Sequence, residues 1–194
     1  MKIYRVFFKH VFDIMGATLA LAFLAIPMLL IALITQLDSD GSAFFAQKRC
    51  GMQRSPFKIL KFRTMSKDAP VDVPTNALKD VNQTKWQKFL RQTSLDELPQ
   101  LINIFKGDMS FVGPRPVIYE EQDLINEREK SGANDVLPGL TGWAQVNGRD
   151  DLNYKKKAKL DAEYVSKMSF WFDLKCLFLT FFCVVRQKNI KKFD

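Results

Sequence analysis

The sequence predicts a mainly helical protein with one small β-hairpin, held at a membrane by a single apolar helix that a proline interrupts. Residues 14–34 form the only long apolar run and contain no charged side chain. Residues 43–65 alternate apolar and basic side chains around a Gly51–Pro56 turn, which is typical of a hairpin. We therefore divide the 194-residue chain into an amphipathic N-terminal segment with the membrane helix, residues 1–37, and a globular domain, residues 38–194.

The apolar run is long enough to cross a bilayer, because a helix rises about 1.5 Å per residue and the hydrocarbon core is about 30 Å thick. Pro27 lies near its centre, where it kinks or breaks a helix at a cost of about 3 kcal/mol. Basic residues stand on both sides of the run, which favours a re-entrant helix with both ends in the cytoplasm. They are Lys2, Arg5 and Lys9 before it, and Lys48, Arg49, Arg54, Lys58, Lys61 and Arg63 after it. A spanning helix with a tolerated kink fits these residues equally well, whereas the run is too long for a cleaved signal peptide.

Helical segments are also expected in the globular domain. They cover residues 85–91, 94–105, 117–130 and 152–167. A polar loop at residues 66–84 and two irregular stretches rich in proline or glycine, at residues 113–116 and 138–149, separate these segments.

The C-terminal segment, residues 169–185, is nearly all apolar, but Asp173 and Lys175 interrupt its start. Its uninterrupted part is too short to span a bilayer. We expect it to lie on the membrane surface or to pack on the first helix, with the basic residues that follow it reaching lipid headgroups. An ordinary buried core helix is the alternative. A homodimer through this segment is an option that nothing in the sequence requires.

The net charge of +8 indicates an anionic partner. The apolar run favours membrane lipid or a phosphorylated small molecule over nucleic acid, so no nucleic-acid partner is expected.

Three cysteines without a CxxC pair support neither a disulfide framework nor a zinc site. The sequence has no GxxxxGK[ST] loop and no GxGxxG motif after a strand, which argues against a nucleoside triphosphatase or a dinucleotide enzyme. With His10 as the only histidine, a Ser-His-Asp set is not expected either.

The strongest candidate for chemistry is the adjacent pair Asp96-Glu97. Taken alone, the pair is explained better as part of a helix cap, since Ser94 and Glu97 have the spacing of a capping box. Its neighbourhood favours a site, because carboxylates that hold a divalent cation together with several basic side chains are suited to a diphosphate. The basic residues that we expect to bind phosphate are Lys61, Arg63, Arg91, Arg115 and Arg149.

Four motifs carry a resemblance to a known family. They are KFRTM at residues 61–65, SLDELPQLINIFKGDMSFVGPRP at 94–116, PGLTGWAQVNGR at 138–149 and FWFDLK at 170–175. These motifs resemble the bacterial sugar transferase family, and more narrowly the small monotopic phosphoglycosyl transferases. The resemblance extends in order over nearly the whole chain.

The resemblance implies a reaction in which a sugar 1-phosphate passes from a UDP-sugar to polyprenyl (undecaprenyl) phosphate, with release of UMP. It maps the family nucleophile to Asp96, which would form a covalent phosphosugar-aspartyl intermediate in a ping-pong cycle. It implies Mg²⁺ at the pair, held in part by Asp96, and it makes Glu97 the second catalytic residue, which orients the metal site as a ligand or acts as an acid or base. It also implies phosphate contacts from Lys61 and Arg149, and Asp173 as a polar partner in the same site. Our choice of Arg63, Arg91 and Arg115 as phosphate ligands comes from their charge and position in the chain.

The resemblance also implies a re-entrant helix broken at Pro27, on the cytoplasmic face of a bacterial inner membrane, with residues 38–194 as a cytoplasmic catalytic domain. Family members often carry a serine before this proline, and Ile26 stands there in this chain, so the kink geometry is open. No motif encodes the sugar, and an N-acetylated amino sugar is expected ahead of glucose or galactose. The competing functions are a non-catalytic module that binds the membrane surface and a conventional glycosyltransferase that releases UDP.

Overall fold

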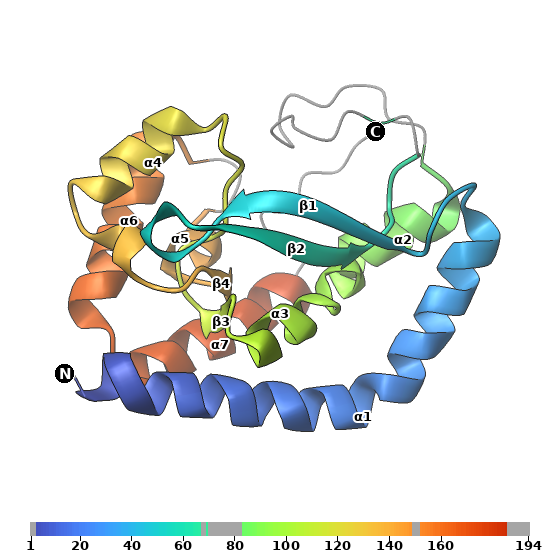
Figure 1. Ribbon diagram of the computed structural model, residues 1–194, viewed down its shortest axis with the longest axis horizontal. Helices are drawn as coiled ribbons and strands as arrows, with labels where there is room; N and C mark the ends of the chain where they lie inside the picture. Colours follow the sequence, from blue (N-terminus) through green and yellow to red (C-terminus); the bar gives the residue numbers. More distant parts are fainter. Residues whose placement is uncertain (1–2, 67–68, 70–82, 149–151, 186–194) are drawn as a thin grey trace.

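The computed structural model describes residues 3–66, 69, 83–148 and 152–185 (Figure 1). Most of these residues are helical, and the expected hairpin is present, which confirms the prediction of a mainly helical protein with one small hairpin. The helices are α1 (Lys9–Asp38), α2 (Lys85–Thr93), α3 (Gln100–Lys106), α4 (Gln122–Glu129), α5 (Trp143–Val146), α6 (Tyr154–Lys167) and α7 (Phe170–Val185). The strands are β1 (Phe44–Cys50), β2 (Pro56–Phe62), β3 (Ser110–Val112) and β4 (Gly139–Thr141).

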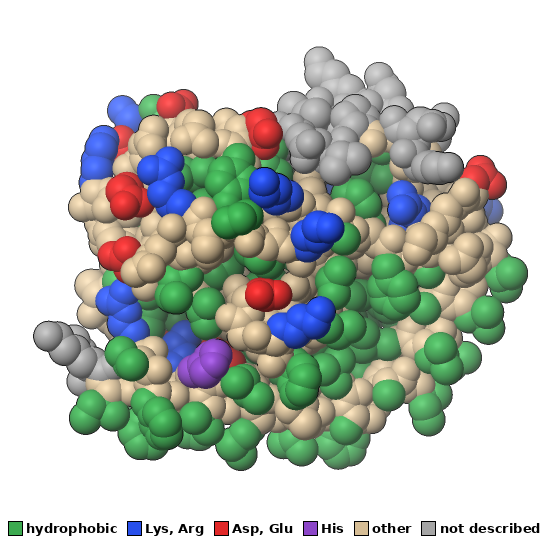
Figure 2. All heavy atoms as spheres, in the orientation of Figure 1, with side chains coloured by type: hydrophobic (Ala, Val, Ile, Leu, Met, Phe, Trp, Pro, Cys, Tyr) green, Lys and Arg blue, Asp and Glu red, His purple; other side chains and the backbone are tan. Residues whose placement is uncertain are grey.

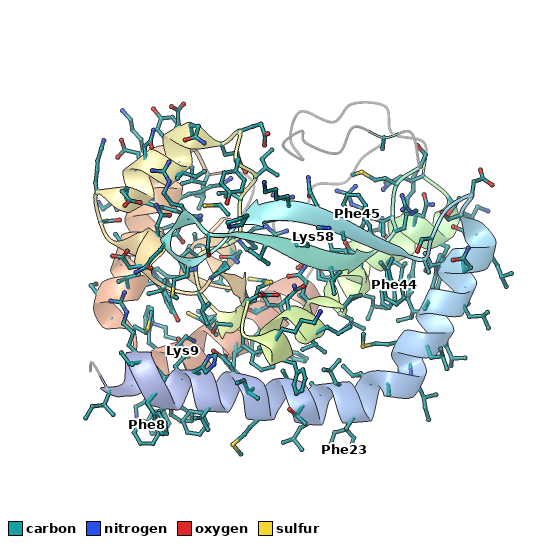
Figure 3. The ribbon with its side chains drawn as sticks, viewed as in Figure 1. Phe8, Lys9, Phe23, Phe44, Phe45 and Lys58 are labelled. Atoms are coloured by element: carbon teal, nitrogen blue, oxygen red, sulfur yellow. The ribbon has the colours of Figure 1, made fainter. Side chains whose placement is uncertain are left out.

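The apolar N-terminal run forms the longest helix. Together with the π-helical turn before it, α1 makes Tyr4–Asp38 long and apolar enough to cross a membrane by length and composition. The helix stays continuous through Pro27. Figure 1 shows α1 bending so that its second half rises towards α2 and the hairpin, and Figure 3 places Phe23 just before the bend. A proline within a helix removes one backbone hydrogen bond and is a common cause of such a bend.

The outer face of α1 is apolar and has no protein partner in the described part of the chain. Phe23 is 82% exposed, and Ile26 and Leu30 beside the proline are exposed as well. In Figure 3, Phe8 and Phe23 point away from the body of the protein, while Lys9 lies on the inner side. Figure 2 shows hydrophobic side chains gathered along this edge of the molecule, with lysines and arginines higher up, over the hairpin. An exposed apolar surface of this extent is typical of a membrane or protein contact.

The hairpin is joined to α3 by one buried side chain. Strands β1 and β2 pair antiparallel, from Phe44 opposite Phe62 to Cys50 opposite Pro56. On the outer edge of β2, the Leu60 amide donates to Asn103 Oδ1 at 2.9 Å, and Asn103 Nδ2 donates to the Lys58 carbonyl at 2.8 Å. Asn103 thus takes the place of a neighbouring strand and fixes the position of α3 on β2.

A second sheet, which the sequence did not predict, consists of β3 and β4 in parallel. The chain leaves β3 through the Pro-rich stretch, forms α4 and returns to β4, as a parallel pair requires. The crossing of the two segments is so close that a Cβ on Gly139 would collide with the backbone nitrogen of Gly113, and one on Gly142 with the Gly113 carbonyl oxygen. The glycines of the GPRP and PGLTG stretches are therefore needed because a side chain there would prevent the two backbones from packing together.

Replacing Gly139 with alanine is expected to lower the free energy of unfolding by about 2–3 kcal/mol or more, because the Gly113 backbone cannot move aside without disrupting the pairing of β3 with β4. Chemical unfolding of the protein in nanodiscs measures the effect. Gly41→Ala is the matched control, since its added methyl group meets only the Arg63 side chain at 3.2 Å. Equal stability of the two variants would contradict the close backbone crossing.

The predicted helices are present, with shifted ends. The segment predicted at 94–105 divides into a 3₁₀ turn, Leu95–Glu97, and α3, and the segment predicted at 117–130 begins as α4 only at Gln122. The helix starts later than predicted because the preceding residues pack on the hairpin. The Val117 carbonyl accepts a hydrogen bond from the Cys50 amide at 2.9 Å, and the Val117 side chain is buried. Of the predicted polar loop, most residues lie outside the described part of the chain.

Helix α7 is buried on one face only. Cys176 is fully buried, whereas Trp171, Phe178 and Phe181 are each at least 63% exposed. The prediction that this segment packs on the first helix is confirmed at its start, where the rings of Phe12 and Phe170 lie 5.5 Å apart. The exposure of the aromatic residues contradicts the alternative of an ordinary buried core helix.

Candidate active site

The Asp96-Glu97 pair lies in the 3₁₀ turn between α2 and α3, and both residues are only 8% exposed. The chain enters this turn through Ser94, which ends α2 in the left-handed conformation with φ of 58°. Ser94 makes no side-chain cap hydrogen bond. The helix-cap explanation of the pair is therefore wrong, and the capping box of this region is formed instead by Thr84 and Gln87 at the start of α2.

The Glu97 carboxylate binds two cations from different parts of the chain. Lys61 Nζ on β2 and Arg115 Nη2, which follows β3, each donate to Glu97 Oε1 at 2.9 Å. The Lys61 side chain is 19% exposed and the Arg115 side chain 32% exposed, so both cations remain partly open to solvent. Charge-assisted hydrogen bonds of this length are stronger than neutral ones. The structure thus brings together the predicted residues Lys61, Glu97 and Arg115 beside Asp96.

The backbone of Arg115 is bound by Arg128, which forms a buried ion pair with Asp161 that the sequence did not predict. Arg128 on α4 donates from Nη1 to the Arg115 carbonyl at 3.0 Å, and from Nε and Nη2 to Asp161 Oδ2 on α6 at 2.8 and 2.7 Å. Burial raises the pKa of the Asp161 carboxyl above its usual value, and the charges of Arg128 and Lys157 oppose this shift. The pair fixes the backbone from which Arg115 reaches Glu97.

The other predicted phosphate ligands are not all gathered at Glu97. Arg63 donates from Nε to the Ser42 carbonyl at 2.7 Å and lies over the ring of Phe45. Phe45, labelled in Figure 3, lies at the end of the hairpin opposite to its turn. Arg91 is partly buried in the last turn of α2, three residues before Ser94. Arg149 lies outside the described residues.

Asp173 lies in a separate network at the start of α1. It accepts hydrogen bonds from Lys9 Nζ at 2.6 Å, the Tyr4 hydroxyl at 2.7 Å and the Tyr164 hydroxyl at 2.8 Å. Burial and the Asp173 charge raise the pKa of Tyr164 well above its usual value, so this hydroxyl remains a donor. Asp173 is therefore placed where it joins α7 to α1 and α6, and its described contacts do not include the Lys61–Glu97–Arg115 cluster.

A cavity of about 230 Å³ adjoins the cluster. Its polar lining includes Ser94, Glu97 and Arg115. Its apolar walls come from the turn before α3, from α3 itself, both strands of the parallel sheet, α5 and α7, with Leu98, Leu101, Phe111, Leu140, Val146 and Leu177. The candidate site thus combines charged groups with an apolar space.

No group of three or more histidine, cysteine, aspartate or glutamate side chains is close enough to hold a metal ion within the described residues. A metal ion at the Asp96-Glu97 pair would therefore share its coordination with groups other than these side chains, such as substrate oxygens or water.

The family model for the bacterial sugar transferases matches residues 4–187 of this chain. The chain belongs to the bacterial sugar transferase family. It is 40% identical to the "Uncharacterized sugar transferase EpsL" of Bacillus subtilis over 95% of this chain and 90% of the relative. It is also 43% identical to the "UDP-glucose:undecaprenyl-phosphate glucose-1-phosphate transferase" of Escherichia coli over 90% of this chain, although it spans only 39% of that protein. The "Exopolysaccharide production protein ExoY" of Rhizobium meliloti is 35% identical over 89% of this chain and 83% of the relative.

Asn103 is a positioning residue of this sugar transferase that sequence patterns could not reveal, because its partners Lys58 and Leu60 lie more than forty residues earlier in the chain. It holds α3, and hence Glu97 just before it, against the strand that carries Lys61. The sole sequence signal is a polar residue on a helix that is otherwise apolar at residues 101–105.

Asn103→Ala is expected to lower the free energy of unfolding by about 1–3 kcal/mol, because it removes the side chain that binds the partly buried Leu60 amide and Lys58 carbonyl. Chemical unfolding in nanodiscs measures the loss. Asn126→Ala, at an exposed position of α4, is the matched control and should change stability by less than about 0.5 kcal/mol. Equal unfolding of the two variants would show that Asn103 does not join α3 to β2.

Proposed function

We propose that this sugar transferase moves a sugar 1-phosphate from a UDP-sugar to polyprenyl phosphate and releases UMP. The names of its relatives support this reaction, since those from Escherichia coli and Caulobacter vibrioides are named UDP-glucose:undecaprenyl-phosphate glucose-1-phosphate transferases. The observation that carries the proposal is the buried Asp96-Glu97 pair with Lys61 and Arg115 directed at it. Two adjacent carboxylates with two cations are suited to phosphoryl transfer.

In the proposed mechanism, Asp96 is the nucleophile. Its carboxylate oxygen attacks the phosphorus that bears the sugar, the bond from this phosphorus to the UMP oxygen breaks, and UMP leaves with the bonding electrons. The sugar phosphate is then an acyl phosphate on Asp96. A phosphate oxygen of the polyprenyl phosphate attacks the same phosphorus in a second displacement, which releases the Asp96 carboxylate and gives the sugar-diphosphate lipid.

Lys61 and Arg115 stabilise negative charge on the phosphate oxygens during these displacements. Glu97 keeps both cations oriented, since each donates to its Oε1 atom, and the buried position strengthens these interactions relative to water. Arg115 is also suited to bind two phosphate oxygens at once through its guanidinium group.

The donor set fits a Mg²⁺ ion shared between protein and substrate. Mg²⁺ prefers oxygen ligands and is commonly bound by one or two carboxylates together with substrate phosphates and water. Asp96 and Glu97 would supply the carboxylate oxygens. When bound, the ion would neutralise diphosphate charge and stabilise the leaving UMP.

Removal of divalent cations with EDTA is expected to reduce UMP release to below about 1% of the initial rate, with recovery on addition of excess Mg²⁺. The melting temperature should change little, because within the described residues the protein offers no closed metal site of its own. An undiminished rate in EDTA would contradict the role of Mg²⁺.

The proposed position is the cytoplasmic face of a bacterial inner membrane, with α1 as a re-entrant helix. The bend in α1, its apolar outer face and the exposed aromatic residues of α7 support a protein that enters one leaflet (Figure 1). Such a position brings a water-soluble donor and an acceptor confined to the bilayer to the same site. In this arrangement the ion pair between Lys9 Nζ and Asp173 Oδ2, at 2.6 Å, joins the start of the membrane helix to the catalytic domain.

The proposed donor is UDP-glucose. The family resemblance led us to expect an N-acetylated amino sugar, a prediction that no contact of the site tests. The names of relatives from Escherichia coli and Klebsiella pneumoniae favour glucose. The "Galactosyl transferase CpsE" of Streptococcus agalactiae, 37% identical over 89% of this chain and 41% of that protein, makes UDP-galactose the next candidate.

The experiment that tests the function measures the released nucleotide. The protein in nanodiscs is mixed with undecaprenyl phosphate, Mg²⁺ and UDP-glucose, UDP-galactose or UDP-N-acetylglucosamine in turn, and UMP and UDP are quantified separately. UMP that depends on the lipid and on one sugar is the expected result. Release of UDP would indicate a conventional glycosyltransferase, and release of neither nucleotide would favour the non-catalytic membrane module.

A further inference from the structure

The cavity beside Glu97 is lined mostly by hydrocarbon side chains. Leu98 and Leu101 form one wall, and Leu140, Val146 and Leu177 line it from β4, α5 and α7. A UDP-sugar is polar over nearly its whole length, so these walls do not match the donor. Apolar surface removed from water favours binding by about 25 cal/mol per Å², which makes a hydrocarbon ligand the better match for this space.

Helix α7 connects the cavity with the surface that we propose meets lipid. Leu177, Cys183 and Val184 line the cavity, while Phe178 and Phe181 of the same helix are each 63% exposed. Figure 1 shows the start of α7 near the first half of α1, in agreement with the contact between the rings of Phe12 and Phe170. A chain that leaves the membrane along α7 would therefore meet the cavity before it meets Glu97.

The cavity also presents polar groups that suit a phosphate. Arg115 lines it together with Gln145, whose side-chain nitrogen and oxygen are both buried without a hydrogen-bond partner in the described structure. A buried amide without a partner is costly, and a ligand that accepts a hydrogen bond from the nitrogen would remove part of that cost. The Thr141 and Thr180 hydroxyls, 2.6 Å apart, hold α7 against β4 and so keep this wall in place.

We propose that this cavity holds the first isoprene units of the polyprenyl acceptor, with the lipid phosphate bound by Arg115 and Gln145. The assignment rests on the proposed function, and it adds which residues contact the lipid. A space of about 230 Å³ accommodates only the part of a long polyprenyl chain nearest the phosphate, so the remainder stays in the bilayer. Selection of the acceptor then depends on its first units and little on its total length.

The test compares two neighbouring residues of α7. Leu177→Trp fills the cavity, whereas Phe178→Trp changes the exposed face of the same helix and leaves the cavity open. Leu177→Trp is expected to raise the KM for undecaprenyl phosphate about ten-fold or more and to leave the KM for UDP-glucose unchanged. Phe178→Trp should leave both values at the parental level. Should Leu177→Trp fail to fold, Val184→Trp fills the same cavity from two turns further along α7.

An unchanged acceptor KM in a folded cavity-filling variant overturns the assignment of the cavity while the function stands. Absence of lipid-dependent UMP from the parental protein overturns the function and the assignment with it. A second readout needs no turnover: a polyprenyl phosphate with a photoreactive group on its first isoprene units is crosslinked to the protein, and the labelled peptides are identified by mass spectrometry. Labels on α5 or α7 support the assignment, and labels confined to α1 overturn it.

Discussion

Asp96→Asn is expected to reduce UMP release by about 10⁴-fold or more, because an amide cannot serve as the carboxylate nucleophile. The substitution is nearly isosteric, and the residue is not part of a helix cap, so the melting temperature should stay close to the parental value. The measurement is UMP release from UDP-glucose in nanodiscs, together with thermal unfolding of the same preparation.

Asp123→Asn is the matched control. This aspartate stands in the first turn of α4 at an exposed position, and its amide variant should keep the parental rate. An Asp96→Asn protein that turns over near the parental rate would refute Asp96 as nucleophile. Loss of activity in both variants would instead point to a general effect of lost negative charge.

Arg128→Met is expected to lower the free energy of unfolding by about 3–5 kcal/mol, because it leaves the Asp161 carboxylate buried without its partner. Arg115 also loses the hydrogen bond to its carbonyl, so UMP release per folded molecule should fall. Replacing both members, as Arg128→Met with Asp161→Leu, should recover much of the stability but not the activity. Lys130→Met, which removes an exposed ion pair with Glu127 at the C-terminal end of α4, should unfold at the parental temperature.

The effect of Arg128→Met should depend on pH. Burial already raises the pKa of Asp161, and without Arg128 this pKa rises further. A carboxyl whose pKa is higher in the folded than in the unfolded protein loses stability as pH rises from the unfolded value of about 4 to the folded value. The stability difference between variant and parent should therefore be smaller at about pH 5 than at about pH 8. A difference that grows towards acid pH would contradict the unpaired carboxylate.

The elements that sequence predicted well are those whose signal is local. The hairpin follows from alternation around the Gly51–Pro56 turn, α2 and α6 fall within segments predicted to be helical, and α7 follows from a nearly continuous apolar run. We predicted Lys61 and Arg115 as site residues from their charge and from the motifs that contain them. That both bind the same carboxylate, Glu97, is seen only in the tertiary structure.

The elements that it missed depend on contacts between distant residues. Ser94 and Glu97 have the spacing of a cap, but the left-handed Ser94 turns the chain so that Glu97 meets Lys61 and Arg115 instead. The three-residue strands β3 and β4 are too short to give a pattern, and they form because glycines let their backbones meet.

Asp173 illustrates the same limit. Its motif resembles a site motif of the family, yet its partners are Lys9, Tyr4 and Tyr164, which lie far away in the sequence. No sequence pattern indicated the Arg128–Asp161 ion pair, since 33 residues separate its two members.

The central claim is that the phosphate next to the sugar travels with it to the lipid. It is tested most directly with UDP-glucose that carries ³²P in this phosphate alone, mixed with the protein in nanodiscs, undecaprenyl phosphate and Mg²⁺. After extraction, the account predicts the label in the lipid fraction, in equal amount to the UMP released. Glucose in the lipid with the label left in UDP would contradict it.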